Sequence, residues 1–151
     1  MTLTYRIAAK DDADLLIAIY NSAFYDDFVR YGECPAYGRT KDKMELSIIK
    51  FPKTIILNMG KPIGVFSVEN KGNGQYYLGC FCIIPSYQRL GIGAQAYQYM
   101  LSVYSDWKYI SLVTPADKEQ NIKFYTEKCG FHTGHREMDG NVEIINLYME
   151  R

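Results

Sequence analysis

Apolar residues recur along the chain at two spacings, every second position in some segments and every third or fourth in others, which distinguishes strands from helices. A short strand is predicted over residues 5–8. Asp11 or Asp12 can cap the helix that follows. The apolar stripe of this helix consists of Leu15, Leu16, Ile19, Tyr20 and Phe24. Residues 25–39 include two glycines and a proline, so we interpret them as a loop.

A second helix and three strands are expected next. Thr40 can cap the helix, which carries Met44 and Ile48 on one face and ends before Pro52. Runs of apolar and β-branched residues predict strands over residues 54–59, 63–68 and 76–84. Short glycine-containing turns separate these runs, which indicates an antiparallel meander.

The pattern changes after the meander. Residues 81–84 are apolar on both faces, as in a strand that is covered on both sides. A helix over residues 95–104 leads to a strand over residues 109–114, and a helical crossover favours parallel pairing with the preceding strand. Residues 118–129 form the next predicted helix, with Gly130 placed to end it.

A final hairpin joins residues 132–138 to residues 142–149 across Asp139 and Gly140. The predicted order is therefore β-α-α-β-β-β-α-β-α-β-β, an α/β class with an α+β mixed sheet. No linker, repeat or low-complexity stretch divides it, so we expect one domain over residues 1–151.

Composition limits the classes of function. The chain has 151 residues and a formal net charge of zero, which argues against a broad nucleic-acid footprint or a polybasic membrane surface. No apolar run approaches the roughly 20 residues of a membrane span, and the N-terminus lacks signal-peptide character. We therefore expect a cytoplasmic protein with neither nucleic-acid nor membrane partners.

The four cysteines are expected to be reduced. Cys80 and Cys82 are two apart in a predicted strand and so face the same side. Together with Cys129, His132 and His135 they fit no standard zinc spacing. We interpret them as small buried apolar residues and expect no metal.

The sequence Gln88-Arg89-Leu90-Gly91-Ile92-Gly93-Ala94 lies between a predicted strand and a predicted helix. Glycine lets a backbone approach an anion closely, and a helix N-terminus offers unpaired N–H groups, so this loop is typical of a phosphate site. The residues from Gly91 onward also match the G-x-G-x-x-A fingerprint of dinucleotide-binding proteins. That interpretation is disfavoured, because an antiparallel meander precedes the loop and five residues separate Pro85 from Gly91.

The pattern of Gln88, Gly91 and Gly93 after Pro85 resembles the acetyl-CoA loop of the GNAT superfamily of N-acetyltransferases. The helix around residues 121–125, followed by Gly130 and Phe131, resembles the same family, as does the order of elements. The resemblance covers nearly the whole chain. It implies a GNAT-like acyl-CoA N-acyltransferase fold and transfer of an acetyl group from acetyl-CoA to a primary amine by direct attack.

The resemblance also implies roles for particular residues. Backbone amides from Arg89 to Ala94 would bind the CoA pyrophosphate, and the strand end would pair with the pantetheine arm where the sheet splays open. The backbone N–H of Ile83 or its neighbour would polarise the thioester carbonyl and stabilise the oxyanion. The cofactor-binding residues so implied are Phe81, Cys82, Ile83, Gln88, Arg89, Leu90, Gly91, Ile92, Gly93, Ala94 and Asn121.

Asn121 and Tyr125 are four apart and share a helix face. By the resemblance, Asn121 contacts CoA and Tyr125 is the catalytic acid that protonates the departing thiolate. The family places its asparagine about seven residues before the tyrosine, where this chain has Lys118. The spacing from Tyr125 to Gly130 is also one residue longer than is common, which predicts a bulge or a shifted register.

The acceptor is expected to be a small-molecule or peptide amine. Residues 23–39 form the acceptor wall by family position, and their aromatic rings and carboxylates predict a preference for cationic amines. Six residues remain alternatives for the general base: Glu69, Glu33, Asp26, Asp27, His132 and His135. A catalytically silent acyl-CoA-binding or sensor module is the alternative function, a larger acyl group is a third, and the resemblance leaves a homodimer open.

Overall fold

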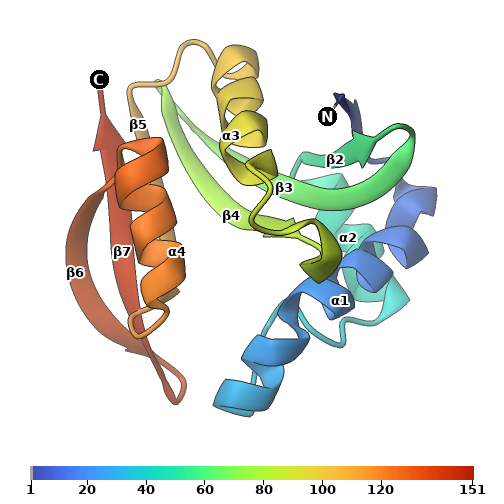
Figure 1. Cartoon of the computed structure of the whole chain (residues 1–151), viewed down its shortest axis with the longest axis horizontal. Coiled ribbons are helices and arrows are strands. Elements are labelled where there is room, and N and C mark those ends of the chain that lie inside the picture. The colour runs from blue at the N-terminus through green and yellow to red at the C-terminus, as the bar shows by residue number, and fades with distance from the viewer. Residues whose placement is uncertain (1) are drawn as a thin grey trace. The chain divides into compact units, whose positions relative to one another are not determined.

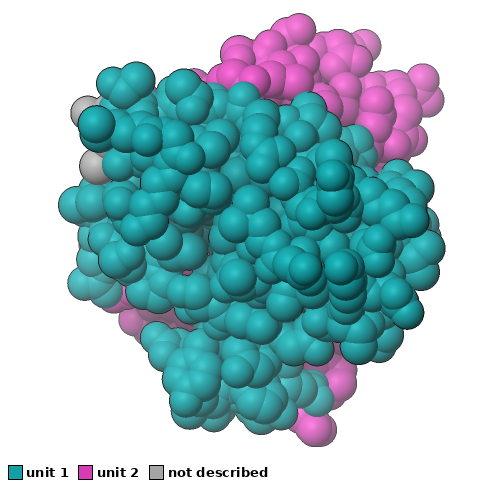
Figure 2. All heavy atoms as spheres, turned by 90° about the vertical axis from the view of Figure 1, so that its right-hand side faces the viewer, with its two compact units in different colours: residues 1–68, 80–93 teal, residues 69–79, 94–151 magenta. Residues whose placement is uncertain are grey.

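The computed structural model describes residues 2–151 (Figure 1). Its seven strands form a mixed sheet in the order β1-β2-β3-β4-β5-β7-β6, which confirms the predicted α/β class and element order. The chain divides into two compact units, coloured separately in Figure 2. Unit 1 comprises residues up to 68 together with 80–93, and unit 2 comprises residues 69–79 together with 94–151. Each is described by itself.

Unit 1 contains the antiparallel part of the sheet. Strands β1 (Leu3–Ile7) and β2 (Lys53–Asn58) pair antiparallel, and β2 pairs antiparallel with β3 (Lys61–Gly72), which continues into unit 2. The β2–β3 register shifts between Ile56 and Leu57. Strand β4 (Gln75–Ile83) also crosses from unit 2 into unit 1.

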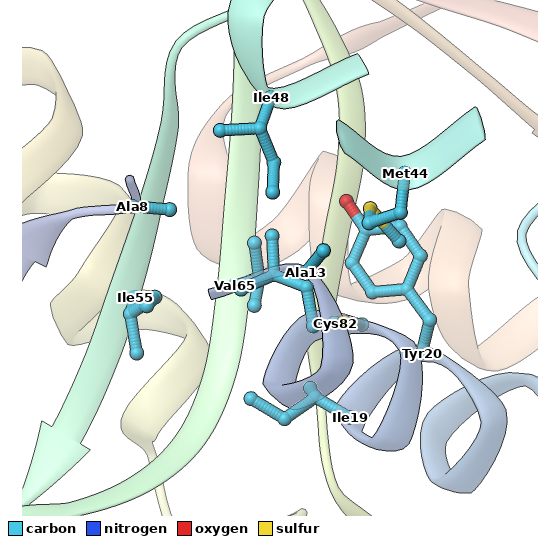
Figure 3. Close-up of a cluster of buried hydrophobic side chains, with 10 residues drawn as sticks. Ala8, Ala13, Ile19, Tyr20, Met44, Ile48, Ile55, Val65 and Cys82 are labelled. Atoms are coloured by element: carbon cyan, nitrogen blue, oxygen red, sulfur yellow. The ribbon is translucent and has the colours of Figure 1, made fainter. Parts of the chain in front are cut away.

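The two helices of unit 1 are α1 (Ala13–Tyr31) and α2 (Lys41–Lys50). They share a hydrophobic core with the strands (Figure 3). Its buried members are Ala8, Ala13, Leu16, Ile19, Tyr20, Met44, Ile48, Ile55, Val65 and Cys82. The cap of α2 is as predicted, because the Lys43 backbone N–H donates to Thr40 Oγ1 at 3.3 Å.

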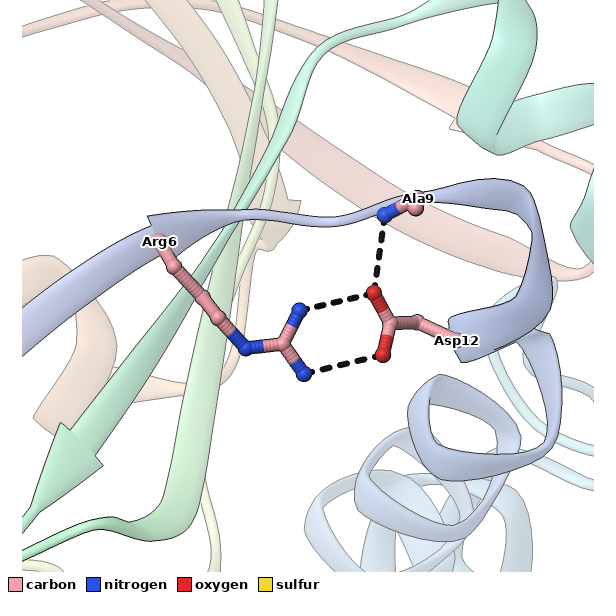
Figure 4. Close-up of polar contacts among 3 residues, drawn as sticks. All are labelled: Arg6, Ala9 and Asp12. Atoms are coloured by element: carbon pink, nitrogen blue, oxygen red, sulfur yellow. Dashed lines mark hydrogen bonds and ion pairs between the residues drawn. The ribbon is translucent and has the colours of Figure 1, made fainter.

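A bidentate ion pair holds β1 to the start of α1 (Figure 4). Arg6 donates to both carboxylate oxygens of Asp12, at 2.8 and 2.9 Å. The Ala9 backbone N–H donates to the same carboxylate at 2.8 Å. Asp12 stands at the helix N-cap but makes no side-chain hydrogen bond to the helix, so its carboxylate stabilises the short 3₁₀ turn Lys10–Asp12 instead.

The prediction of a loop over residues 25–39 is wrong for its first half. Helix α1 continues to Tyr31 and ends where Gly32 takes a left-handed conformation with φ of 74°. Tyr25 and Val29 are exposed, at 54% and 63%, so this part of the helix has no continuous buried stripe. The spacing of apolar residues therefore did not indicate a helix in this segment, although no residue before Gly32 interrupts it.

Unit 2 contains the parallel pair and the C-terminal hairpin. Strand β5 (Tyr109–Pro115) runs parallel to β4, as predicted. Strand β7 (Val142–Glu150) lies between β5 and β6 (His132–Asp139) and is antiparallel to both. Asp139 pairs with Val142, so the two-residue turn is Gly140–Asn141 rather than Asp139–Gly140.

The helices of unit 2 are α3 (Ile92–Val103), which starts at the end of unit 1, and α4 (Glu119–Lys123). A π-helical segment, η3 (Phe124–Cys129), continues α4. Gly130 ends it in a left-handed conformation with φ of 89°, as predicted. The core of this unit includes Ala96, Tyr97, Met100, Ile110, Leu112, Phe131, Ile145 and Leu147.

Candidate active site

The glycine loop of unit 1 turns the chain from β4 into α3. After β4 ends at Ile83, a 3₁₀ turn (Pro85–Tyr87) leads into the loop. Gln88 Nε2 donates to the Ile83 carbonyl at 2.8 Å, so the side chain of the loop's first residue closes it onto the strand. Arg89 and Gly91 both have positive φ, of 63° and 80°. The loop therefore has a specific left-handed path rather than a simple corner.

The loop presents backbone rather than packed side chains. Gln88, Arg89, Leu90 and Gly91 are exposed, whereas Ile92 is 2% exposed and fixes the first residue of α3 in the core. A Cβ added at Gly91 would meet no atom within 4 Å. Glycine is thus required here for its conformation, and the space beside it is open to a ligand. An open, glycine-bearing helix N-terminus fits a pyrophosphate.

The end of β4 supplies Phe81, Cys82 and Ile83. Phe81 packs edge-on against Phe66 at 6.3 Å between ring centroids, and Cys82 is 6% exposed. A Cβ at Gly64 would lie 2.5 Å from the Cys82 carbonyl oxygen, so β3 and β4 approach closely at this point. One edge of β4 is therefore held tightly by β3.

The parallel pairing of β4 with β5 is short. It covers Gln75–Tyr77 against Tyr109–Ser111, all within unit 2, although both strands continue beyond it. Strand β5 stays paired with β7 as far as Pro115. Within the described residues, β5 therefore has an unpaired edge from Leu112 onward. An unpaired strand edge is suited to β-augmentation by an extended ligand.

Unit 2 holds the other implied site residues, Ala94, Asn121 and Tyr125. Ala94 lies in the first turn of α3. Asn121 lies in α4, and Tyr125 lies in η3. The predicted bulge is confirmed, because η3 is a π-helical segment of six residues. A π-bulge adds one residue to a helix without moving its ends, which explains the longer spacing to Gly130.

Tyr125 is 9% exposed and lies among aromatic rings. Phe124 and Phe131 stand edge-on to it, with ring centroids 5.1 and 5.6 Å away. The Tyr125 carbonyl accepts a hydrogen bond from the Phe131 backbone N–H at 2.9 Å and one from the Gly130 N–H. The ring is thus held from two sides.

Asn121 is fixed to the end of β5. Its Nδ2 donates to Thr114 Oγ1 at 3.2 Å, and Thr114 is buried. Lys118 stands at the N-cap of α4, outside the helix proper. Of the two residues that could take the family's asparagine position, only Asn121 therefore lies within the helix.

The alternatives for the general base lie mainly on the surface. Glu69 lies 3.8 Å from Lys71, and His135 lies 3.8 Å from Glu137. His132 is exposed beside the Tyr148 ring. None of these environments distinguishes one candidate as the base.

Sequence analysis missed a group of cations in unit 1. Lys53 is only 3% exposed, its Nζ donates to Ser67 Oγ at 3.0 Å, and burial lowers its pKa to about 8. The Arg39 guanidinium lies over the Tyr20 ring, 5.4 Å from its centroid. No motif pointed to either, since Lys53 begins a strand and Arg39 lies in a loop.

Two thiols lie beside these cations. Cys80 and Cys82 are both free, as predicted. A hydrogen bond between them lowers the pKa of Cys80 and raises that of Cys82, because the proton stays on Cys82. Burial raises the pKa of the neighbouring Tyr20 hydroxyl, which lies against the Cys80 thiol.

Residues 14–131 match the family model described as the acetyltransferase (GNAT) family. The chain belongs to the GNAT acetyltransferase family. A 78-residue stretch is 37% identical to YrkN of Bacillus subtilis (strain 168), described as an uncharacterized protein. That stretch is 51% of this chain and 42% of YrkN, so the chain spans less than half the length of this curated relative.

Solved GNAT structures share the fold. The PaiA N-acetyltransferase of Thermoplasma acidophilum, in complex with coenzyme A, superposes with a TM-score of 0.78 at 16% identity, over 97% of this chain and 98% of that one. The ribosomal-protein-S18-alanine N-acetyltransferase of Escherichia coli gives 0.78 at 15%, over 99% and 94%. YncA of Salmonella typhimurium, a putative acetyltransferase with its cofactor acetyl-CoA, gives 0.75 at 12%, over 99% and 94%.

The described residues contain neither membrane-spanning helices nor clusters of metal ligands. Over residues 2–151, the structure contains no helix long and apolar enough to cross a membrane. Over the same residues, no three or more His, Cys, Asp or Glu side chains come together as metal ligands would.

Proposed function

We propose that the protein is an acetyl-CoA-dependent N-acetyltransferase, an enzyme that works as a single domain over residues 1–151 and acetylates a primary amine. Its family membership and the left-handed loop at the start of α3 support the proposal. The loop is the observation that carries it, because Arg89 and Gly91 have the positive φ angles that are found where successive backbone amides form an anion site.

The loop and the strand end would hold the co-substrate. Backbone amides from Arg89 to Ala94 would bind the pyrophosphate, and the backbone of Phe81–Ile83 would pair with the pantetheine arm. Acetyl-CoA supplies an activated acetyl thioester, which an amine attacks directly. The backbone N–H near Ile83 would stabilise the negative charge that develops on the carbonyl oxygen.

Tyr125 would serve as the acid. An ordinary phenol has a pKa near 10 and a thiol one near 8.5, so a tyrosine keeps its proton at neutral pH and can donate it to a departing thiolate. The packing of Phe124 and Phe131 around the Tyr125 ring supports this role, since it fixes the position of the phenol.

The test has two steps. Acetyl-CoA should first raise the melting temperature, and thiol release should then be measured over a panel of small amines and peptide N-termini. Saturable thiol release with at least one amine supports the enzyme. Binding of acetyl-CoA without acetylation of any amine contradicts it and favours a silent acyl-CoA-binding module, for which the burial of Tyr125 at 9% exposure is the structural argument.

We further propose a cytoplasmic location. The acceptor is a small-molecule or peptide amine, with no nucleic-acid or membrane partner. A homodimer remains a prediction, which sedimentation of the purified protein tests.

A further inference from the structure

Unit 1 contains a hollow of about 370 Å³ between the loop after α1 and the first turns of α2. It is lined by Cys34, Pro35, Tyr37, Gly38, Arg39, Lys43 and Ser47. Ligand pockets begin at about 300 Å³, so the hollow suits a small molecule or one end of a larger one. Its lining has two cationic side chains and two hydroxyl groups but no carboxylate.

The cations of this hollow are not neutralised by the protein. Arg39 Nε donates a hydrogen bond to the Pro35 carbonyl at 3.1 Å, and its Nη1 donates one to Ser47 Oγ at 3.4 Å. Within the described residues, Arg39 makes no ion pair. Lys43 makes none there either. Two carboxylates of α1 and α2 pair with other lysines, Glu45 with Lys10 and Asp14 with Lys41.

The interior beside Arg39 adds a third positive charge. Burial lowers the pKa of Lys53 most, the neighbouring Cys80 raises it, and the charge of Arg39 lowers it further. The Arg39 guanidinium lies over the ring of buried Tyr20, whose hydroxyl lies against the Cys80 thiol. Clustered cations without carboxylates are costly in a folded protein unless an anion binds among them.

The hollow is also defined in shape. Tyr37 stacks on Phe28 of α1, with ring centroids 4.6 Å apart and planes inclined by 12°. The Gly38 backbone N–H donates to Asn21 Oδ1 at 2.8 Å. These contacts join the loop to α1, so that the half-buried Arg39 lines a preformed hollow, which the exposed Lys43 also borders.

We propose that this hollow binds the acidic group of the acceptor, and that the acceptor is therefore a primary amine that also carries a carboxylate or phosphate. The inference rests on the proposed function for the amine and on the hollow for the acid. An arginine fork beside a lysine suits either acid, because guanidinium groups bind carboxylate and phosphate oxygens in pairs. The lining reverses the preference for purely cationic amines expected from the carboxylates of residues 23–39.

Matched pairs of amines test the proposal. Glycine, β-alanine and 4-aminobutyrate are compared with their amides, and phosphoethanolamine with ethanolamine. Binding is measured by calorimetry without acetyl-CoA, and KM and kcat are measured by thiol release. The acid member of at least one pair should bind about tenfold more tightly and show a KM lower by the same factor. The carboxylate and phosphate pairs distinguish the two acids.

Variants locate the effect. Lys43→Gln should remove most of the preference in KM while leaving kcat within about twofold, and Arg39→Gln should remove all of it. Arg39→Lys should restore part of the binding, which a merely structural role for the guanidinium would not allow. Lys41→Gln is the control, because Lys41 begins the same helix but does not line the hollow.

Each result has one meaning. Equal binding of every acid and amide, or a preference that survives both Lys43→Gln and Arg39→Gln, overturns the proposal. Binding of inorganic phosphate without any preference for acidic amines overturns it too, because the acid then does not belong to the acceptor. Preferential binding of acidic amines without acetylation leaves the anion site standing and contradicts the proposed function.

Discussion

In unit 1, the amine of Lys53 is buried with the Ser67 hydroxyl as its hydrogen-bond partner, whereas in unit 2 the phenol of Tyr125 is buried between phenyl rings. The first environment disfavours a charged amine, since burial lowers the pKa of Lys53 to about 8, and the second packs a phenol against two aromatic rings. An uncompensated cation attracts an anion, and a neutral phenol retains a proton that it can donate. The two units thus bury polar groups of different chemistry, an amine in unit 1 and a phenol in unit 2.

Substituting the phenol tests the unit 2 side of this comparison and has the largest expected effect. Tyr125→Phe should reduce turnover by about 10²-fold or more, because general acid catalysis contributes about that much, while acetyl-CoA binding stays unchanged. Steady-state thiol release and calorimetry measure the two quantities. Tyr104→Phe is the control, since Tyr104 is a half-buried tyrosine of the same unit that packs on Tyr76. Unchanged turnover in Tyr125→Phe would remove the residue from the mechanism.

Removing the buried charge tests the unit 1 side. Lys53→Met should raise the free energy of unfolding at pH 7 by about 2 kcal/mol, because folding no longer takes a charged amine out of water. The pKa of Lys53 is lowered to about 8 from 10.5, so the unfolded chain binds the extra proton between these values. Wild-type stability should therefore rise relative to the variant from pH 8 to pH 10.5.

Urea unfolding of both proteins across that range measures the difference, and titrations common to both cancel. Lys41→Met is the matched control, because Lys41 is exposed. A constant difference between wild type and Lys53→Met at all pH values would contradict the assignment of a buried charge to unit 1.

The glycine loop can be compared with a turn of the same geometry. Gly91 and Gly60 have φ of 80° and 81°, and a Cβ at either would meet nothing within 4 Å. Alanine at either should cost about 1 kcal/mol of stability through left-handed strain. Gly91→Ala should also weaken acetyl-CoA binding about tenfold, because the strain shifts the amides of the loop. Equal acetyl-CoA affinities of the two variants would show that the loop does not bind CoA.

The ion pair between Arg6 and Asp12, at the surface of unit 1, is expected to have the smallest effect on stability. The Arg6 guanidinium lowers the pKa of Asp12 below its usual value, so this pair stabilises the fold above about pH 4 and the contribution is lost as pH falls through the lowered pKa. Asp12→Asn should cost about 1 kcal/mol or less at pH 7, since Arg6 is largely exposed. Thermal unfolding at pH 7 and pH 3 checks this prediction. If Asp12→Asn lost equal stability at both pH values, the contribution of the ion pair would not depend on pH as predicted.

The comparison also explains what the sequence could predict. The loop from Gln88 to Ala94 and the stop at Gly130 depend on local conformation, which glycine reports directly. The bulge in η3 was predicted from a spacing one residue too long. The cations Arg39 and Lys53 were not predicted, because their environment comes from contacts far apart in sequence, with Tyr20 and Ser67. The exposed end of α1 was missed for a different reason, since a helix without a buried stripe has no periodic signal.

The most direct test of the central proposal is the thermal shift with acetyl-CoA. At a concentration of about 100 times Kd, binding adds about 2.7 kcal/mol, which for a chain of this size raises Tm by about 5–10 °C. We predict that rise for the wild type and a smaller one for Gly91→Ala, with Gly60→Ala giving the wild-type shift once its own lower Tm is subtracted. No shift in the wild type at millimolar acetyl-CoA would contradict the assignment of the glycine loop as a CoA site.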